Sequence, residues 1–353
     1  MALYDRIAEL PLVIDSYALD GLSRSFGGSG WMRRTTVIRL LGAGHDGVGE
    51  DVSWAEEDQL DQQRRGPVLP LPGTWTVDSF SRHLEELDFY GGGAPSFPEY
   101  RGYRRWAFES AAVDLALRQA GLALHEMLDR DPVPLRFAVS LRLGSPPSDA
   151  GVLRRLEAYP GIRFKLDAEP GWDDELISRL AATGAVDVID FKGAYKGTVV
   201  DVETDPRLYA TVAEAFPSAW LEDPDLAPAE AAAALEPHRE RITWDAPIHS
   251  VEDVLARDQL PRALNCKPSR FGSWRELMRF YDFCAGRDIG LYGGGQSELG
   301  PGRGQIQLLA SLMHPEGPND VAPPGFDWED FPSGLPSSPL DPAPEAAGFR
   351  RRA

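Results

Sequence analysis

The chain has 353 residues, of which 42% are hydrophobic, so it can bury the core of one large barrel plus a smaller domain, or of two to three ordinary domains. Its 55 acidic residues outnumber 36 lysines and arginines, and the net charge of −19 disfavours binding to nucleic acid or to an anionic membrane. The two cysteines have no metal-ligand spacing and suit a reducing compartment. Because the first residues lack a secretory pattern and no apolar run reaches the length of a membrane helix, we expect a cytoplasmic protein that does not bind membranes.

The first 130 residues have the pattern of a small α+β domain. The expected strands are the β-rich runs 12–17, 35–41 and 48–52. Between the first two runs, the Gly- and Ser-rich segment 20–32 is expected to be either a mobile loop that closes over a substrate or, as composition alone favours, a plain surface hairpin loop. Apolar residues at helical spacing predict a long helix over 104–128.

From Pro132 onward, short apolar strands alternate with helical stretches. This alternation is typical of a closed parallel barrel or of an open doubly wound sheet. Charged residues recur at every strand end rather than at one point of the sheet, which favours the barrel. We therefore expect an α/β fold with a (β/α)8-type, modified TIM barrel of (β/α)7β form over residues 131–320. It would follow an N-terminal α+β capping domain, residues 1–130, onto which the Pro- and Ser-rich tail 321–353 packs back.

Five ionisable residues mark the ends of successive expected strands: Lys165, Asp190, Glu222, Asp245 and Lys267. The gaps between them are each about one βα unit long. Because side chains alternate between the two faces of a strand, these charges would point into the barrel, where burial is costly unless they pair or hold a cation. One interpretation is a ring of structural salt bridges. The other is an active site, in which three carboxylates bind a hard cation such as Mg²⁺ and the two lysines transfer protons.

The order of the motifs along the chain resembles the enolase superfamily, and within it the muconate-lactonising branch with its o-succinylbenzoate synthases, N-acylamino acid racemases and dipeptide epimerases. The resemblance covers nearly the whole chain. It rests on the hairpin Thr36-Val-Ile-Arg-Leu with Gly47-Val-Gly-Glu50, the helix from Phe108, Arg163-Phe-Lys165, Trp220-Leu-Glu-Asp-Pro224, Trp244-Asp245, Asn265-Cys-Lys-Pro-Ser-Arg-Phe-Gly272, and the segment Gly294 to Arg303.

The resemblance implies a lyase or an isomerase, such as a racemase, an epimerase, a cycloisomerase or a dehydratase. Such an enzyme removes a proton α to the carboxylate of a small molecule and stabilises the resulting enediolate on Mg²⁺. Lys165 and Lys267 would be the catalytic acid/base pair, and Asp190, Glu222 and Asp245 would bind the metal. A homo-oligomer is also expected.

Other polar residues are expected on the inward face or at the mouth of the barrel, where they could contact the substrate. They are Ser140, Arg163, Lys192, Asn265 and Glu298.

The third strand departs from the superfamily pattern, because it reads Ile189-Asp190-Phe-Lys192 where the family usually has Asp-Ala-Asn. By alternation Lys192 shares the face of Asp190, so its ammonium would repel the cation or replace part of its charge. The alternative function is therefore a metal-free carboxylate-binding barrel, or one whose catalysis has drifted, with Lys192 in place of the metal. The segment that follows is expected to form an inserted loop at the mouth.

Overall fold

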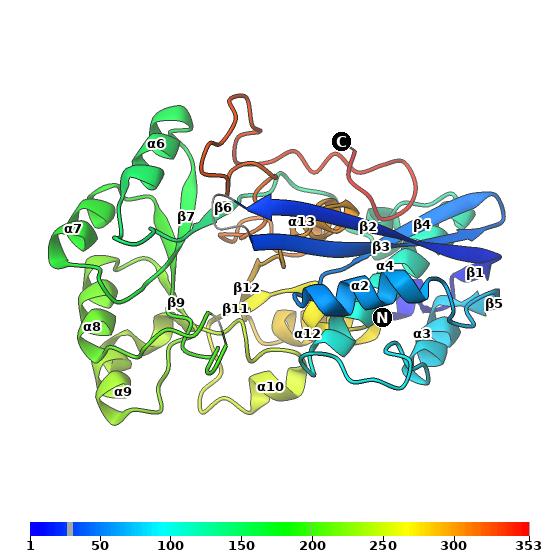
Figure 1. Cartoon of the computed structure of the whole chain (residues 1–353), viewed down its shortest axis with the longest axis horizontal. Helices are drawn as coiled ribbons and strands as arrows, with labels where there is room; N and C mark the ends of the chain where they lie inside the picture. The colour runs from blue at the N-terminus through cyan, green and yellow to red at the C-terminus, as the bar shows by residue number, and fades with distance from the viewer. Residues whose placement is uncertain (27–30, 199, 353) are drawn as a thin grey trace.

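The computed structural model describes residues 1–26, 31–198 and 200–352. Figure 1 shows an N-terminal half, which we call the cap, beside a larger half built from β6 onward. The cap elements are α1 (Asp5–Ala8), β1 (Pro11–Ile14), β2 (Ser16–Phe26), β3 (Trp31–Gly42), β4 (His45–Asp51), α2 (Glu56–Arg65), β5 (Gly73–Thr76), α3 (Val77–Glu85), α4 (Tyr100–Ala120) and α5 (Leu124–Leu128).

The cap is built on an antiparallel sheet of order β2-β3-β4, with β1 and β5 as a separate antiparallel pair. Helix α4 packs directly on β4, because two glycines leave room for its backbone. A Cβ atom at Gly47 would lie 2.2 Å from the Ala111 carbonyl oxygen, and one at Gly49 would lie 2.0 Å from that of Ala107. Any side chain at these two positions would therefore push the helix off the sheet.

The expectation of a loop over residues 20–32 is wrong for the described residues. Strand β2 continues to Phe26 and β3 begins at Trp31, so the segment is a long hairpin arm, while residues 27–30 lie outside the described residues. In this arm the two backbones pair with each other, which satisfies their polar groups whatever the composition of the side chains. In Figure 1 the arm runs from the cap toward β6.

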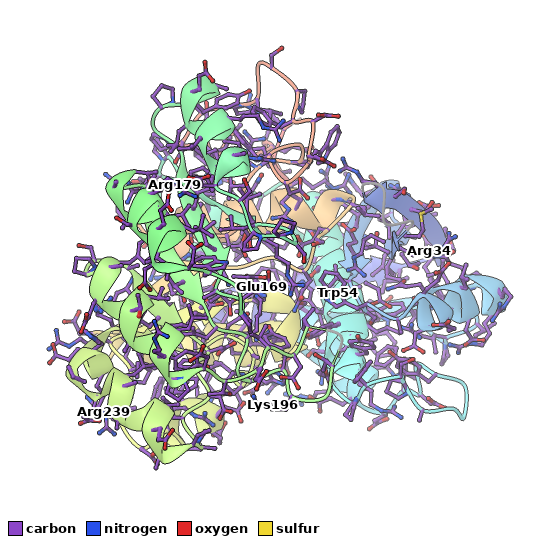
Figure 2. All side chains as sticks on the ribbon, turned by 60° about the vertical axis from the view of Figure 1, so that its left-hand side comes forward. Arg34, Trp54, Glu169, Arg179, Lys196 and Arg239 are labelled. Carbon is purple, nitrogen blue, oxygen red and sulfur yellow. The ribbon has the colours of Figure 1, made fainter. Side chains whose placement is uncertain are left out.

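The second half alternates parallel strands with outer helices. Its elements are β6 (Ala138–Leu141), α6 (Ala150–Ala158), β7 (Arg163–Asp167), α7 (Asp174–Ala182), β8 (Val186–Asp190), α8 (Pro206–Ala215), β9 (Trp220–Glu222), α9 (Ala229–Leu235), η2 (Glu236–Arg241), β10 (Ile242–Thr243), α10 (Val251–Leu255), β11 (Ala263–Cys266), α11 (Pro268–Phe271), α12 (Trp274–Ala285), β12 (Gly290–Gly293) and α13 (Pro301–Met313). Figure 2 shows Arg179 and Arg239 on the outer helical layer and Arg34 on the cap.

Backbone hydrogen bonds join the parallel strands into a ring. Strands β6 to β10 form one parallel sheet in chain order, and β11 pairs with β12 in a second. The links between the sheets are Asn265 N to Trp244 O (3.1 Å), Asp320 N to Gly293 O (2.8 Å) and Ala138 N to Asn319 O (2.8 Å). Residues 319–320 thus occupy the eighth position of the ring, after seven strands in the described part of the chain. The predicted capped barrel is confirmed.

The protein has two large hydrophobic cores, and the first of them joins the two halves. One is shared between the cap and α12, and it includes Phe108 of α4 and Trp274 of α12. The other lies between the strands β6 to β9 and their helices, with Phe164 and Leu221 buried in it. No helix in the described ranges combines the length and apolar character needed to cross a bilayer.

The C-terminal segment returns to the cap. Phe349 is buried with its ring 5.0 Å from that of Trp274. The carboxylate of Asp114 in α4 accepts hydrogen bonds from Phe349 N (2.7 Å) and Arg350 Nε (2.6 Å). The division of the chain at residues 130 and 320 stays a prediction.

Candidate active site

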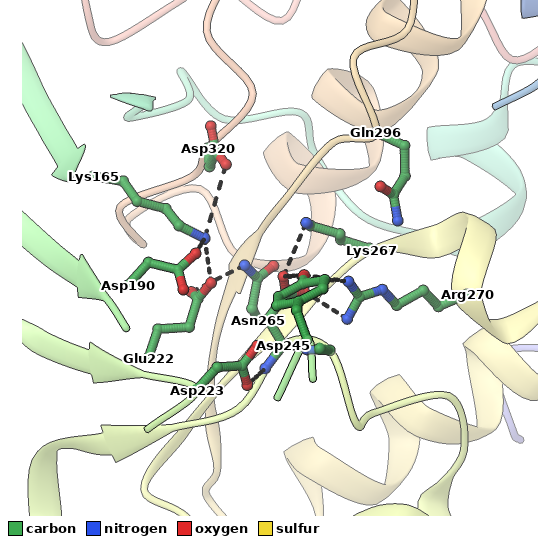
Figure 3. A network of polar contacts seen from close by, with 12 residues as sticks. Lys165, Asp190, Glu222, Asp223, Asp245, Asn265, Lys267, Arg270, Gln296 and Asp320 are labelled. Atoms are coloured by element: carbon green, nitrogen blue, oxygen red, sulfur yellow. Dashed lines mark hydrogen bonds and ion pairs between the residues drawn. The ribbon is translucent and has the colours of Figure 1, made fainter. Parts of the chain in front are cut away.

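The five strand-end residues meet at the carboxyl end of the barrel (Figure 3). Lys165 lies in β7, Asp190 and Glu222 are the last residues of β8 and β9, and Asp245 and Lys267 follow β10 and β11. All five are buried. Parallel strands that end on the same side of a barrel bring residues far apart in the sequence to one place.

Lys165 is paired with carboxylates on two neighbouring strands. Its Nζ lies 3.0 Å from Asp190 Oδ2, forms a close ion pair with Glu222 and lies 4.0 Å from Asp320 Oδ2. Burial alone would lower the pKa of Lys165, but the attraction of Asp190 and Glu222 outweighs it and raises this pKa well above its usual value. The ammonium form is therefore favoured as long as both carboxylates contact it.

Three buried carboxylates are grouped as a cation site requires. One oxygen each of Asp190, Glu222 and Asp223 lies within 4.8 Å of the others. Asp223 reaches this position because its backbone has a left-handed φ of 48°. Its carboxylate accepts hydrogen bonds from the backbone N–H groups of Asp245 and Ala246, both at 2.8 Å.

The surroundings of these three carboxyl groups shift their pKa values in opposite directions. Burial raises the pKa of Glu222 to about 8, and burial together with Asp245 raises that of Asp223 to about 7. Burial would also raise the pKa of Asp190, but Lys165 and Lys192 hold it well below its usual range. A further positive charge at this point would therefore be stabilised.

Asp245, which the sequence predicts as the third metal ligand, is bound by cations of the protein. Its carboxylate pairs with Lys267 Nζ at 2.9 Å and with Arg270 Nη1 at 3.0 Å, and the Tyr195 hydroxyl donates to it at 3.2 Å. Burial alone would raise the pKa of Asp245, but Arg270 and Lys267 hold it well below its usual range. Asp223 stands in the carboxylate group where Asp245 was expected, and the role of Asp245 as a ligand stays a prediction.

Lys192 lies where the sequence departs from the superfamily pattern. It has a left-handed φ of 54°, its Nζ forms a close ion pair with Asp190, and it lies 3.2 Å from Asp167 Oδ1. Burial would lower the pKa of Lys192, but Asp167 and Asp190 raise it well above its usual value. Lys192 thus pairs with Asp190 and Asp167, whereas Glu222 is paired with Lys165.

Besides Lys192, two of the predicted substrate-binding residues lie beside the strand-end group. Ser140 of β6 is in register with Lys165 of β7. Asn265 of β11 donates to Glu222 Oε2 at 3.1 Å. Its side-chain oxygen is buried with no hydrogen-bond partner among the described residues, so a bound polar ligand would satisfy it.

The other two have different surroundings. Glu298 accepts from Gln296 N at 2.6 Å and pairs with Arg303 at 3.1 Å, in the segment that follows β12. Arg163 begins β7, pairs with Asp187 and donates to Gly184 O at 2.7 Å. It lines a cavity of about 540 Å³ at the amino end of the barrel, so its position argues against contact with a substrate at the mouth.

Several residues of the site were missed in the sequence. They are Asp223, Tyr195, Arg270, Asp320 and Tyr292, whose hydroxyl donates to Glu222 at 2.5 Å. Tyr292 could have been found, because it occupies an inward position of β12. Arg270 lies in the short helix α11, and the other three come from turns and irregular segments, so strand alternation gives no signal for them.

Family models match both halves of the chain. The model described as the N-terminal domain of a domain of unknown function (DUF8230) matches residues 5–127, and that of its C-terminal domain matches residues 131–328.

Two curated relatives are enzymes by name. The chain is 27% identical over 251 residues to an o-succinylbenzoate synthase of Bacillus subtilis, a match that covers 67% of the chain and 64% of the relative. It is 28% identical over 351 residues to an N-succinylamino acid racemase of Thermus thermophilus, covering 92% of the chain and 86% of that relative. The chain spans about three-fifths of the length of the curated o-succinylbenzoate synthases that it matches.

Solved structures share the fold. An enolase-superfamily protein of Listeria innocua matches with a TM-score of 0.69 at 18% identity, covering 91% of this chain and 88% of that one. A dipeptide epimerase of Methylococcus capsulatus, complexed with a Mg ion, matches with a TM-score of 0.65 at 18% identity, covering 87% and 89%. The resemblance to the enolase superfamily, as a divergent relative of its muconate-lactonising branch, is confirmed.

Proposed function

Because this chain belongs to the family described as a domain of unknown function (DUF8230) and has the enolase-superfamily fold, we propose that it is an enzyme that removes a proton α to the carboxylate of a small molecule. The enzyme would be a lyase or an isomerase. The observation that carries this proposal is the placement of two lysines at the second and sixth of eight positions in the ring. Positions four apart in a ring of eight are opposite each other, so the two ammonium groups approach a shared centre from two sides.

The use of lysine in the chain supports a role in proton transfer. The chain has only four lysines, Lys165, Lys192, Lys196 and Lys267, whereas its other 32 basic residues are arginines. All four lie at the mouth of the barrel, where they pair with carboxylates of the strand ends and of the loops next to them. A lysine can lose its proton in a protein interior and an arginine cannot, so a site that uses an amine as base requires lysine.

Lys165 and Lys267 would be the acid/base pair. Lys165 can act as base only after the carboxylates that now hold its ammonium engage another positive charge, since removal of that attraction lowers its pKa. Lys267 would have to leave Asp245, with which it now pairs. The other lysine, still protonated, would then return a proton to the opposite face of the substrate carbon or stabilise negative charge.

The carboxylate group fits Mg²⁺. Asp190, Glu222 and Asp223 offer three buried carboxyl oxygen donors, which is the ligand type that this cation prefers. Bound there, Mg²⁺ would neutralise the substrate carboxylate and stabilise the enediolate. Asp245 would serve as a further ligand only if Lys267 and Arg270 released it.

Lys192 favours a second candidate function. Its ammonium already contacts Asp190 and Asp167, so it supplies one positive charge at the place where the cation would bind. In this alternative the barrel binds a carboxylate without a metal, on its lysines alone. Binding of Mg²⁺ by the wild-type protein distinguishes the two candidates.

The names of the relatives suggest which substrates to try first. They include a succinylamino acid racemase and a dipeptide epimerase, so N-acyl amino acids and dipeptides head the panel, followed by sugar acids. A homo-oligomeric state and a cytoplasmic location stay predictions.

The experiment measures uptake of deuterium at the α-carbon. Each compound is incubated with the protein and Mg²⁺ in D₂O and followed by proton NMR. We expect at least one compound of the panel to exchange its α-proton with the wild-type protein and with Arg239→Ala on the outer layer, but not with the double variant Lys165→Ala/Lys267→Ala. Exchange that persists in the double variant would refute the assignment.

A further inference from the structure

The loop that follows β8 reaches into the barrel mouth. We call residues 192–198 the mouth loop. Besides the pairing of Lys192 with Asp190 and Asp167, the loop sends in Tyr195, whose hydroxyl donates to Asp245 Oδ2 at 3.2 Å and accepts from Arg270 Nη2 at 3.0 Å. The loop thus contacts two of the strand-end carboxylates, Asp190 through Lys192 and Asp245 through Tyr195.

The outer side of the mouth loop is fastened to the loop after β9. A Cβ atom at Gly193 would lie 2.2 Å from the backbone nitrogen of Asp225, and Gly193 N donates to Asp223 O at 2.8 Å. Lys196 pairs with Asp225 at 3.0 Å and donates to Thr204 at 3.1 Å. Figure 2 shows Lys196 at the surface, in the lower middle of that view. These contacts seat the loop in one position.

In this position the groups that would receive a ligand are occupied by the chain itself. Asp190 is engaged by Lys192, and Asp245 and Arg270 by Tyr195.

We propose that the mouth loop is a gate, with Lys192 and Tyr195 as its two inner contacts. Closed, it places an ammonium and a phenol where a cation and a polar substrate would otherwise meet Asp190 and Asp245. Opening requires that Lys192 and Tyr195 leave these carboxylates, while the strands behind them stay in place. The inference rests on the proposed function for the identity of what enters, but not for the movement of the loop.

Hydrogen exchange followed by mass spectrometry tests the gate on the whole protein without any substrate. The reporters are the amides within the loop, since Tyr195 N donates to Lys192 O at 3.1 Å and Thr198 N to Tyr195 O at 3.1 Å. Tyr195→Phe removes both phenol hydrogen bonds, each to a charged group, and we expect exchange in residues 193–198 to speed up on the order of ten- to a hundredfold. Exchange in β8 and β9 should stay as in the wild type.

A second variant and a matched control complete the test. Gly193→Ala forces a side chain against the Asp225 backbone, so it should also speed exchange in the loop without touching the phenol. Tyr159→Phe removes a phenol that bonds Pro332 O and Leu335 N far from the mouth, and should leave the loop unchanged. The gate would be overturned if the loop of Tyr195→Phe exchanged its amides at the wild-type rate, or if Tyr159→Phe sped up exchange in the loop by the same factor.

The two proposals fail in different ways. If the loop opens in Tyr195→Phe but no compound of the panel exchanges its α-proton with any form of the protein, the gate stands and the proposed function falls. If α-protons exchange while the loop of Tyr195→Phe exchanges at the wild-type rate, the function stands and the gate falls.

Discussion

Replacing Lys192 by methionine should strengthen the binding of Mg²⁺. The substitution keeps an unbranched side chain of similar length and removes the ammonium that contacts Asp190 and Asp167. With that charge gone, Asp190 keeps Lys165 as its cationic partner, and the carboxylate group becomes more negative. The affinity of a divalent cation for this group should rise accordingly.

The size of the effect follows from Coulomb's law. Two unit charges about 4 Å apart interact by about 4 kcal/mol in a medium of effective dielectric constant about 20. Asp167 lies 3.2 Å from the Lys192 ammonium and can retain it when a cation binds Asp190, which offsets much of the repulsion. We therefore expect a residual gain of about 1.4 kcal/mol or more, which is a dissociation constant about tenfold lower or better.

Titration calorimetry measures this change, and chelator-reversible shifts of the melting temperature check it. Lys196→Met is the matched control, because Lys196 pairs with Asp225 instead of the carboxylate group. Equal affinities of Lys192→Met and the wild type for Mg²⁺ would refute the electrostatic reasoning. Binding by Lys192→Met alone would favour the metal-free function for the wild-type protein.

Three further predictions concern stability and the ligand set. Burial lowers the pKa of His314 to about 4 from an ordinary 6.5, so the unfolded chain takes up a proton at a higher pH than the folded protein does. The free energy of unfolding is therefore unaffected by His314 above pH 6.5 and falls by about 3 kcal/mol as the pH drops toward 4. Urea unfolding of His314→Gln at several pH values should show a shallower acid slope, and an unchanged slope would contradict this. Phe349→Ala should cost about 3–5 kcal/mol in urea unfolding, because its ring is buried against Trp274, and a loss below about 1 kcal/mol would mean that the C-terminal segment docks weakly. Asp223→Asn should weaken the binding of Mg²⁺, measured by calorimetry, more than Asp245→Asn does. A larger loss of affinity in Asp245→Asn would restore Asp245 as the ligand.

Strand periodicity was enough to find the fold and the main charges of the site. The apolar runs that end in Lys165, Asp190 and Glu222 are β-strands, and side-chain alternation aims these charges inward. Because parallel strands of a barrel end on one side, spacing in the sequence translated directly into proximity in space.

The remaining groups depend on turns and on tertiary contacts that no periodicity encodes. Asp223 joins the carboxylate group through a left-handed backbone, and Tyr195 arrives from an irregular loop. Asp320 belongs to an isolated bridge too short to be recognised as a strand. Arg163 shares the inward face of β7 with Lys165, yet it begins the strand and therefore pairs with Asp187 at the amino end of the barrel.

The most direct test of the opposed lysines uses the two enantiomers of a compound that exchanges its α-proton. Each enantiomer presents its α-proton to one side of the barrel, so each should depend on one lysine as base. We predict that Lys165→Ala loses α-deuterium exchange with one enantiomer and retains it with the other, and that Lys267→Ala shows the reverse preference. Equal loss or equal retention for both enantiomers in the two variants would contradict a centre flanked by Lys165 and Lys267.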